Sequence, residues 1–339
     1  MPEISVIMPV YNCESFIKES VDSILGQSFT NYEFIIIDDA STDRTVEIIQ
    51  EYDDSRIQLI IKPANTGYTD SLNMAIKLAK GRYIARMDGD DVSLAHRLAV
   101  QYEYLEKNPS TMIVGSHYKV IGADYVVKLP VSSHAVEMVA LMHVPVAHPT
   151  VMMRKELFTT HKLYYDKNFE PAEDYDLWCR VLKFGKIENV DEVLLYYRHH
   201  EQQISKLKYE KLLKIAVSTR LSQLQKLLSF PNKRYDFLFA IDVLTWNLKK
   251  LERQDLKKIK CLMDDLLKNN KRKKVFQEEI LHQYLQERWN HYKKMYPFSD
   301  VADIPLLLSV PSNNLTIFGT RFRMGKLLRI TGLKKLIAP

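Results

Sequence analysis

Three carboxylates stand within four residues of one another, where Asp88, Asp90 and Asp91 flank Gly89. Like charges this close repel and resist ionising together. A divalent cation relieves that repulsion, because Mg²⁺ and Mn²⁺ prefer oxygen ligands and are often held by one or two carboxylates together with substrate phosphates. The cluster therefore predicts a metal-assisted site for a phosphate-bearing substrate. A solvated acidic turn is the plain alternative.

The residues on either side of the cluster predict the elements that position it. Residues 83–87 are apolar apart from Arg86, as in a short buried strand, and the carboxylates follow directly. After them, Ser93 is expected to cap a helix whose buried side carries Leu98 and Leu105. Open α/β sheets present their ligand sites in this way, at the carboxyl ends of their strands.

Three more strand-and-helix units precede the cluster. Strands are expected at 4–8, 33–37 and 56–61, each followed by apolar residues at helical spacing, and Asp43 is expected to cap the second helix. Four such units in a row predict an α/β fold with a doubly wound, parallel sheet and right-handed crossovers. Asp38 and Asp39 end the second strand, so we expect them at the same edge of the sheet as the acidic cluster.

Residues 111–205 show a mixed pattern. Short strands are expected at 112–114, 151–153, 187–190 and 194–197, and a helix is expected over 172–184. Glu173 and Asp174 fall in the first turn of that helix. Such acids serve either as a general base or simply as favourable charges at a helix start.

Composition divides the chain of 339 residues into two parts. Residues 206–339 hold 28 Lys+Arg against 12 Asp+Glu, a net +16, whereas residues 1–205 hold 20 against 30, a net −10. We expect these parts to be different structural units, the second mainly helical. The three cysteines lie far apart, which argues against a disulfide framework or a zinc site. We expect no signal peptide and no spanning helix.

With these residues in view, positions 1–205 resemble the family 2 glycosyltransferases, which have a GT-A type fold. The resemblance rests on eight motifs that occur in chain order. They are Pro9-Val10-Tyr11-Asn12, Asp38-Asp39-Ala40-Ser41-Thr42-Asp43, Asn65-Thr66-Gly67, Ser71-Leu72-Asn73 with Gly81, Ile84-Ala85-Arg86-Met87-Asp88-Gly89-Asp90-Asp91, His148-Pro149, Ala172-Glu173-Asp174-Tyr175-Asp176-Leu177-Trp178, and Tyr197-Arg198-His199-His200 running to Ile204-Ser205.

The resemblance implies a role for each matched residue. Residues 1–115 would form a Rossmann-like half that binds the nucleotide-sugar, 116–205 an acceptor half that carries the base, and 206–339 a helical C-terminal extension. Asp174, beside Glu173, would be the catalytic base. Tyr11 would lie against the nucleotide base and Asp39 would accept a hydrogen bond from it. The implied nucleotide-binding set is Pro9, Tyr11, Asn12, Asp38, Asp39, Asn65, Gly67 and Asp88, and the implied metal set is Asp90, Asp88, Asp91 and His200, with His199 in the variable position.

The resemblance also implies the reaction. A sugar would pass with inversion from a nucleotide-sugar, UDP-linked by the habit of the family, to a hydroxyl of a glycan or lipid-linked acceptor. A divalent cation, Mn²⁺ or Mg²⁺, would be the cofactor, and the products would be cell-surface polysaccharide, lipopolysaccharide or lipooligosaccharide. The chain lacks the glutamine-any-any-arginine-tryptophan element of processive synthases in this family. It is therefore expected to add one sugar, or a few, and release.

Three other classes remain as alternatives. A nicotinamide dehydrogenase would carry a glycine-rich fingerprint after the first strand, where this chain has Pro9 to Glu14. A nucleotidyltransferase shares the nucleotide half of the fold but normally has a glycine-rich first loop. A nucleic-acid binder could use the basic residues after 205, where aromatic residues alternate with bases at 291–296. The acidic first part would repel phosphates, and we expect no nucleic-acid partner.

The basic C-terminal part suggests a membrane surface as a partner. Anionic lipids attract Lys and Arg, and residues 315–339 interleave apolar and basic side chains as an interfacial amphipathic helix does. We therefore expect a cytoplasmic protein, peripheral on the inner face of the cell membrane. The alternative is a helical extension that packs its apolar stripe on the catalytic domain and leaves its lysines in water.

Overall fold

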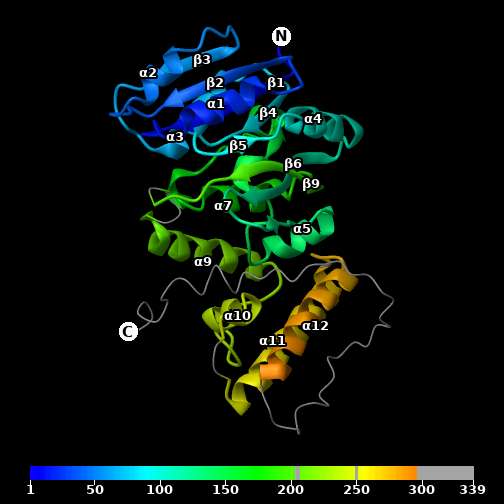
Figure 1. Cartoon of the computed structure of the whole chain (residues 1–339). Helices are drawn as coiled ribbons and strands as arrows, with labels where there is room; N and C mark the ends of the chain where they lie inside the picture. The colour runs from blue at the N-terminus through cyan, green and yellow to red at the C-terminus, as the bar shows by residue number, and fades with distance from the viewer. Residues whose placement is uncertain (202, 204–206, 249–250, 296–339) are drawn as a thin grey trace.

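A computed structural model describes residues 1–201, 203, 207–248 and 251–295. Its centre is one nine-stranded sheet in the order β3-β2-β1-β4-β8-β6-β9-β5, with β7 paired to β6. Figure 1 shows helices covering the sheet and a group of helices below it. The α/β class expected from the sequence is confirmed.

The first half of the sheet is parallel and doubly wound, as expected. β1 lies between β2 and β4, and β2 pairs in turn with β3, all in parallel. Side chains alternate across β1, so Val6 packs with α1 on one face and Ile7 with α3 on the other. These elements are β1 (Ile4–Val10), α1 (Ile17–Leu25), β2 (Tyr32–Asp38), α2 (Thr45–Gln50), β3 (Ile57–Ile61), α3 (Tyr68–Leu78) and β4 (Tyr83–Arg86).

The second half of the sheet mixes directions. β8 is antiparallel to β4 and β6, β9 runs parallel to β6, and β5 is antiparallel to β9. The fully buried Arg97 donates to the carbonyls of Arg86 (2.6 Å) and Val151 (3.3 Å), which ties the end of β4 to the start of β8. These elements are β5 (Val92–Ser93), α4 (Arg97–Lys107), β6 (Thr111–Val120), β7 (Val126–Val127), α5 (Ser133–Ala140), η1 (His148–Thr150), β8 (Met152–Arg154), α6 (Glu156–Thr159), η2 (Lys167–Phe169), α7 (Glu173–Val181) and β9 (Lys186–Tyr197).

Two helix starts differ from the sequence prediction. Ser93 caps no helix, because Val92 and Ser93 pair with β9, and a turn at residues 95–96 separates them from α4, which begins at Arg97. α2 begins at Thr45 with Arg44 in the cap position, one residue later than a cap at Asp43 requires. The Asp43 carboxylate still accepts a hydrogen bond from the Thr45 amide at 3.0 Å, so it serves the first turn from one position further out.

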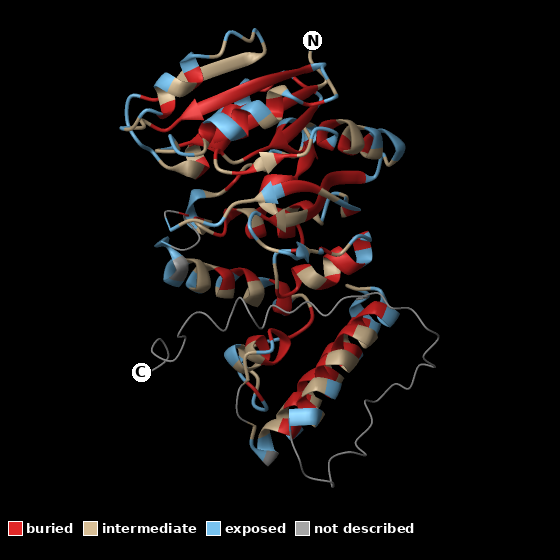
Figure 2. Cartoon of the chain, viewed as in Figure 1, coloured by how far each residue is buried: buried red, intermediate tan, exposed pale blue. Residues whose placement is uncertain are grey.

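The described residues after 205 are mainly helical, as expected. Their core includes Met138 of α5 together with Leu141 and Met142, which follow it, so these helices pack against α5. Figure 2 shows buried residues on both α5 and α12. No helix within the described ranges is long and apolar enough to cross a membrane. Residues 315–339 lie outside the described residues, as does most of the boundary expected near 205. The helices are α9 (Tyr209–Gln225), α10 (Phe237–Leu244), α11 (Arg253–Lys273) and α12 (Glu278–Met295).

Candidate functional site

The acidic turn follows β4 and gathers three carboxylates. Asp88, Asp90 and Asp91 each offer an oxygen atom within 4.8 Å of the others. Asp91 is fully buried: its Oδ1 accepts the Arg198 amide at 2.9 Å, and its Oδ2 lies buried without a hydrogen-bond partner. Burial, together with the charges of Asp88 and Asp90, raises the pKa of Asp91 well above its usual value. The turn therefore concentrates negative charge that its own protein partners only partly relieve.

This donor set fits a hard divalent cation. All the candidate ligand atoms are carboxylate oxygens, and one of them, Asp91 Oδ2, is buried without a hydrogen-bond partner among the described residues. A positive ion would stabilise the ionised form of all three side chains. Asp88 and Asp90 are the more accessible pair, with side chains 24% and 21% exposed. Asp91 lies deeper and anchors the turn to the strand that precedes Arg198.

Arg86 is the cation already inside the site. Its guanidinium is buried and donates to both oxygens of Asp88, at 2.7 Å for Nη1 to Oδ2, and to the Tyr68 hydroxyl. Burial raises the pKa of Asp88 to about 6 even though Arg86 opposes the shift. Asp88 is thus held in place by a charge that comes from its own strand.

His200 reaches the acidic turn, and His199 does not contact it in the described structure. His200 Nε2 lies 2.8 Å from Asp90 Oδ2, with its ring packed on Phe16 at 4.8 Å. The His199 ring packs on Tyr197 instead, and its Nδ1 lies 3.4 Å from the Gln203 amide oxygen. The structure therefore brings His200 beside the carboxylates, and metal binding by His200 stays a prediction.

The loops after β1 and β2 meet at the same edge of the sheet. The Asn12 amide donates to Ser41 Oγ at 2.9 Å, and Asn12 Oδ1 accepts the Thr42 amide at 2.8 Å. Asp38 is fully buried, with one oxygen on the Ser41 amide and the other without a partner. Because β1, β2 and β4 are parallel, the expected shared edge for Asp38, Asp39 and the acidic turn is confirmed.

The remaining nucleotide candidates line this edge in different ways. Tyr11 follows β1 with 47% of its surface exposed, Pro9 is buried in the strand, and Asn65 is exposed. Asp39 is nearly buried, because its carboxylate accepts hydrogen bonds from Lys62 Nζ (2.5 Å) and from the Thr66 (3.0 Å) and Gly67 (2.9 Å) amides. As it stands, Asp39 holds the loop before α3, and its contact with a nucleotide base stays a prediction.

The acid pair at the start of α7 lies in an apolar setting. Burial, followed by the charge of Asp174, raises the pKa of Glu173 to about 8, and one Glu173 oxygen is buried without a partner. Burial raises the pKa of Asp174 to about 6, against a hydrogen bond from the Tyr175 amide and the charge of Arg86. Of the two, Asp174 has the pKa that is raised less far, and it is therefore the better candidate to accept a proton.

A chain of hydrogen bonds runs from Asp88 in the acidic turn to the hydroxyl of Tyr165. Arg86 contacts the Tyr68 hydroxyl, which lies 3.4 Å from His148 Nδ1, and His148 Nε2 lies 2.8 Å from the Tyr165 hydroxyl. Burial, with a further push from Arg86, lowers the pKa of His148 well below its usual value. His148 is therefore neutral and can donate to one tyrosine while it accepts from the other.

The comparisons with known proteins identify the family of this chain. A model of the family described as Glycosyl transferase family 2 matches residues 5–169. A glycosyltransferase of Haemophilus influenzae, named as uncharacterized, is 35% identical over 218 residues, which cover 60% of this chain and 68% of that protein. The Escherichia coli UDP-Glc:alpha-D-GlcNAc-diphosphoundecaprenol beta-1,3-glucosyltransferase WfaP is 35% identical over 219 residues, which cover 63% of this chain and 84% of that enzyme.

The chain belongs to the family 2 glycosyltransferases. A solved structure, S. aureus TarS 1-349 in complex with UDP-GlcNAc, aligns with a TM-score of 0.59 and 18% identity over 89% of this chain and 95% of that chain. This likeness concerns the fold, which it shows to be of the glycosyltransferase type expected from the sequence. The protein is thus a transferase enzyme, and the dehydrogenase and nucleic-acid alternatives are set aside.

Several residues of this family 2 glycosyltransferase site were not given roles from the sequence. Arg86 could have been found, because it is the one charge in an otherwise apolar strand. His148 belongs to a recognised motif, but its two tyrosine partners come from segments 80 positions before it and 17 after it. Lys62, which binds Asp39, gave no signal, since a lysine after a strand usually faces water.

Proposed function

We propose that this glycosyltransferase moves a sugar, with inversion, from a UDP-linked donor to a hydroxyl of a glycan or lipid-linked acceptor. The reaction would serve the synthesis of cell-surface polysaccharide, at the cytoplasmic face of the membrane. The observation that carries the proposal is that two acidic sites share one buried cation, Arg86. Arg86 donates to Asp88 in the turn whose three carboxylates could hold a metal ion, and its charge also favours the ionised form of Asp174, the candidate base.

The relatives support the choice of substrates. The WfaP name specifies a UDP-glucose donor and a diphosphoundecaprenol-linked acceptor, and the similarity covers 84% of that enzyme. The name of one relative does not fix the donor sugar of this chain. The shared feature proposed here is the class: a nucleotide-sugar and a membrane-linked or glycan hydroxyl.

The residues of the chain divide the work of transfer. Asp88 and Asp90 would hold the divalent cation, with His200 in support, and when bound it supplies Lewis-acid stabilisation of charge on the departing diphosphate. The loops of Tyr11 and Asp39 would orient the nucleotide. Asp174 would take the proton of the acceptor hydroxyl as that oxygen attacks the anomeric carbon, a contribution typically worth about 10²–10⁴-fold in rate. One base and one displacement invert the anomeric centre.

A direct test measures UDP release from UDP-sugars in the presence of Mn²⁺. Turnover should stop in excess EDTA and return with Mn²⁺, because the carboxylates of the acidic turn need a cation. Asp90→Asn should lose activity while its far-ultraviolet circular dichroism stays unchanged. Asp53→Asn, which alters an exposed carboxylate away from the site, is the matched control and should keep full activity. Full turnover of the wild type in excess EDTA would contradict the metal-dependent proposal.

A further inference from the structure

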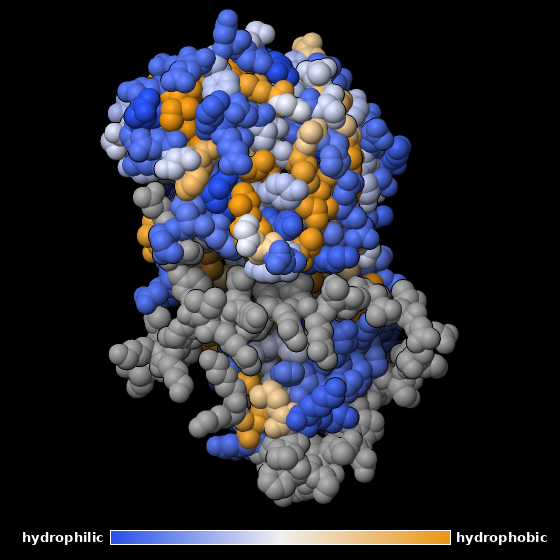
Figure 3. All heavy atoms as spheres, in the orientation of Figure 1, coloured by the Kyte–Doolittle hydropathy of each residue, from blue (hydrophilic) through white to orange (hydrophobic). Residues whose placement is uncertain are grey.

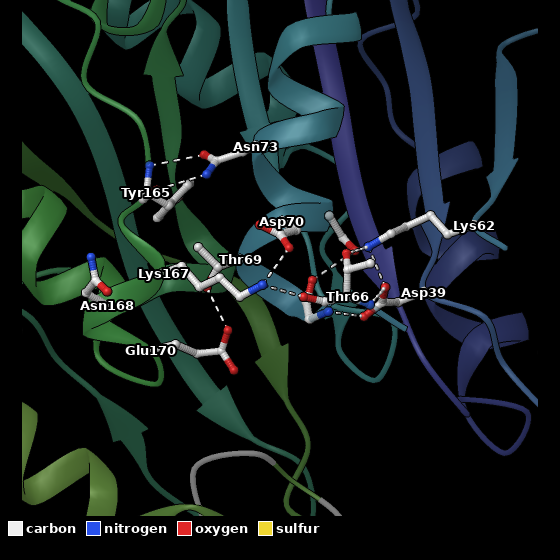
Figure 4. Close-up of polar contacts among 12 residues, drawn as sticks. Asp39, Lys62, Thr66, Thr69, Asp70, Asn73, Tyr165, Lys167, Asn168 and Glu170 are labelled. Carbon is white, nitrogen blue, oxygen red and sulfur yellow. Dashed lines mark hydrogen bonds and ion pairs between the residues drawn. The ribbon is translucent and has the colours of Figure 1, made fainter. Parts of the chain in front are cut away.

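The amino-terminal end of α3 lies between the two halves of the site. On one side, Asp39 accepts hydrogen bonds from the amides of Thr66 and Gly67, the two residues that precede the helix. On the other side, residues 163–170 cross the first turns of α3 and lead directly into α7, where Asp174 lies. Figure 4 shows both sets of contacts around the same helix end.

Three side-chain bridges fasten residues 163–170 to α3. Thr69 Oγ1 donates to Glu170 Oε2 at 3.1 Å, and Lys167 Nζ donates to Asp70 Oδ2 at 2.8 Å. The Asn73 amide makes two bonds with the backbone of Tyr165: Nδ2 donates to the carbonyl at 2.9 Å, and Oδ1 accepts the amide at 3.1 Å. Thr69, Asp70 and Asn73 all lie in the first two turns of α3, so the three bridges come from one end of the helix.

The three bridges are not of equal weight. The Lys167–Asp70 pair is largely in water, with side chains 60% and 41% exposed, and exposed ion pairs contribute little. The Asn73 bridge satisfies both the donor and the acceptor of a buried residue, and its loss would leave two backbone groups without partners. Asn73 is therefore the contact whose removal should loosen this segment most.

Tyr165 connects the segment held by Asn73 to α7, the helix that carries Asp174. Its hydroxyl lies 2.8 Å from His148 Nε2, and its ring packs edge-on against Trp178 at 6.5 Å between centroids. Trp178 belongs to α7, the helix that begins with Glu173 and Asp174. The backbone of Tyr165 is thus fixed by α3 and its side chain by the helix of the base.

We propose that Asn73 is a positioning residue for sugar transfer, which holds the segment before α7 so that Asp174 meets the acceptor hydroxyl. The inference rests on the proposed function, since it assumes Asp174 as the base. It separates two roles of this segment: Thr66 and Gly67, just before α3, contact Asp39 on the nucleotide side, and Asn73, in the second turn of the helix, serves the acceptor side. A change at Asn73 should therefore affect transfer and spare nucleotide binding.

The first test is Asn73→Ala, with Asn168→Ala as the matched control. Asn168 lies on the same segment, and its amide bonds only to Asp166 in the described contacts, at 2.9 Å, so the control removes the same group without touching α3. Asn73→Ala should lower kcat by about 10–100-fold, because small misplacements of a reacting group are costly. The Kd for UDP with Mn²⁺, measured by calorimetry, should stay within about twofold. Asn73→Gln, which keeps both hydrogen-bonding groups, should recover part of kcat.

A second measurement tests the restraint without any turnover. Amide hydrogen exchange over residues 163–175 should speed up in Asn73→Ala and stay unchanged in Asn168→Ala, since local opening sets exchange rates. If wild type releases UDP from no sugar nucleotide, the proposed function fails, and the exchange result still decides whether Asn73 restrains this segment. Should Asn73→Ala not fold, Thr69→Val, which removes the bond to Glu170, takes its place in both assays. Unchanged exchange, an unchanged kcat, or an equal loss of UDP affinity would each overturn the inference.

Discussion

At the scale of single residues, Asp174 should set the pH dependence of the reaction. Its pKa is raised to about 6 by burial, and only the ionised form can accept a proton. We therefore expect kcat to rise with pH through about 6 and to level off above it. Asp174→Asn should lower kcat by about 10²-fold or more at pH 7.5, with little change in UDP affinity. If Asp174→Asn kept normal activity, Asp174 would not be the base and would act only as a favourable charge at the start of a helix.

Glu173 offers a sharp contrast on the same turn of helix. Burial and the neighbouring Asp174 charge raise its pKa to about 8, so it is mostly protonated at pH 7. Glu173→Gln replaces a protonated carboxyl with a neutral amide of similar shape, and we expect it to keep most of the wild-type kcat at pH 7. If Glu173→Gln were as damaging as Asp174→Asn in steady-state assays, the order of the two roles would be reversed.

The neighbouring histidines should also separate by role. His200 contacts Asp90, whereas His199 packs on Tyr197, so their side chains meet different partners. We expect His200→Ala to weaken Mn²⁺ binding measured by titration and His199→Ala to leave it near the wild-type value. Equal losses in the two variants would contradict this assignment.

At the scale of elements, the turn between α3 and β4 packs closely on β1 and leaves no room for a side chain at Gly81. A Cβ there would lie 2.5 Å from the Ser5 amide nitrogen of β1 and 2.9 Å from Ser5 Oγ, which accepts the Gly81 amide. Because the nearest atom is backbone, the strand itself must shift. Gly81→Ala should therefore lower the free energy of unfolding by about 1–3 kcal/mol in urea titration. Lys80 is adjacent and exposed, so Lys80→Ala should change the free energy of unfolding little. If Gly81→Ala also left it unchanged, β1 would be able to shift at little cost.

Secondary structure was predicted well where a segment showed a clear local pattern of apolar residues. β1, β2 and β4 read as buried apolar strands, and Asp39 and Asp88 follow their carboxyl ends as expected. Prediction was poorer where a distant partner decided the outcome. Ser93 looked like a helix cap, yet pairing with β9 a hundred positions later holds it extended. The tyrosines around His148 likewise come together only through tertiary structure, which no local pattern encodes.

At the scale of the whole molecule, charge divides the sequence into two parts. Residues 206–339 carry a net +16 and the rest −10. Figure 3 shows the visible described part of the lower helices as mainly hydrophilic, with a small apolar area. The described helices bury their apolar stripes against one another and α5, so much of their positive charge faces water. This arrangement leaves electrostatic attraction, and not helix insertion, as the way the described part would meet a membrane.

The full chain should therefore bind anionic vesicles in a salt-dependent manner. Lys and Arg near a negatively charged surface contribute about 1 kcal/mol each, and salt screens that attraction. Co-sedimentation with phosphatidylserine vesicles should fall as salt rises and should be absent with neutral vesicles. Deletion of residues 315–339, which lie outside the described structure, should weaken binding if that stretch takes part. A chain that ignores anionic vesicles at low salt would contradict the peripheral-membrane proposal.

The bond between the Arg198 amide and Asp91 spans 107 positions. This separation matters during protein synthesis, because Asp91 leaves the ribosome well before Arg198 does. The parallel strands β1 to β4 can pair early, but the acidic turn then lacks both its backbone donor and the His200 contact to Asp90. A chain arrested before β9 would thus contain all the loops proposed to bind the nucleotide, but the proposed cation site would be incomplete. Catalytic competence should appear late, only after translation has passed residue 200.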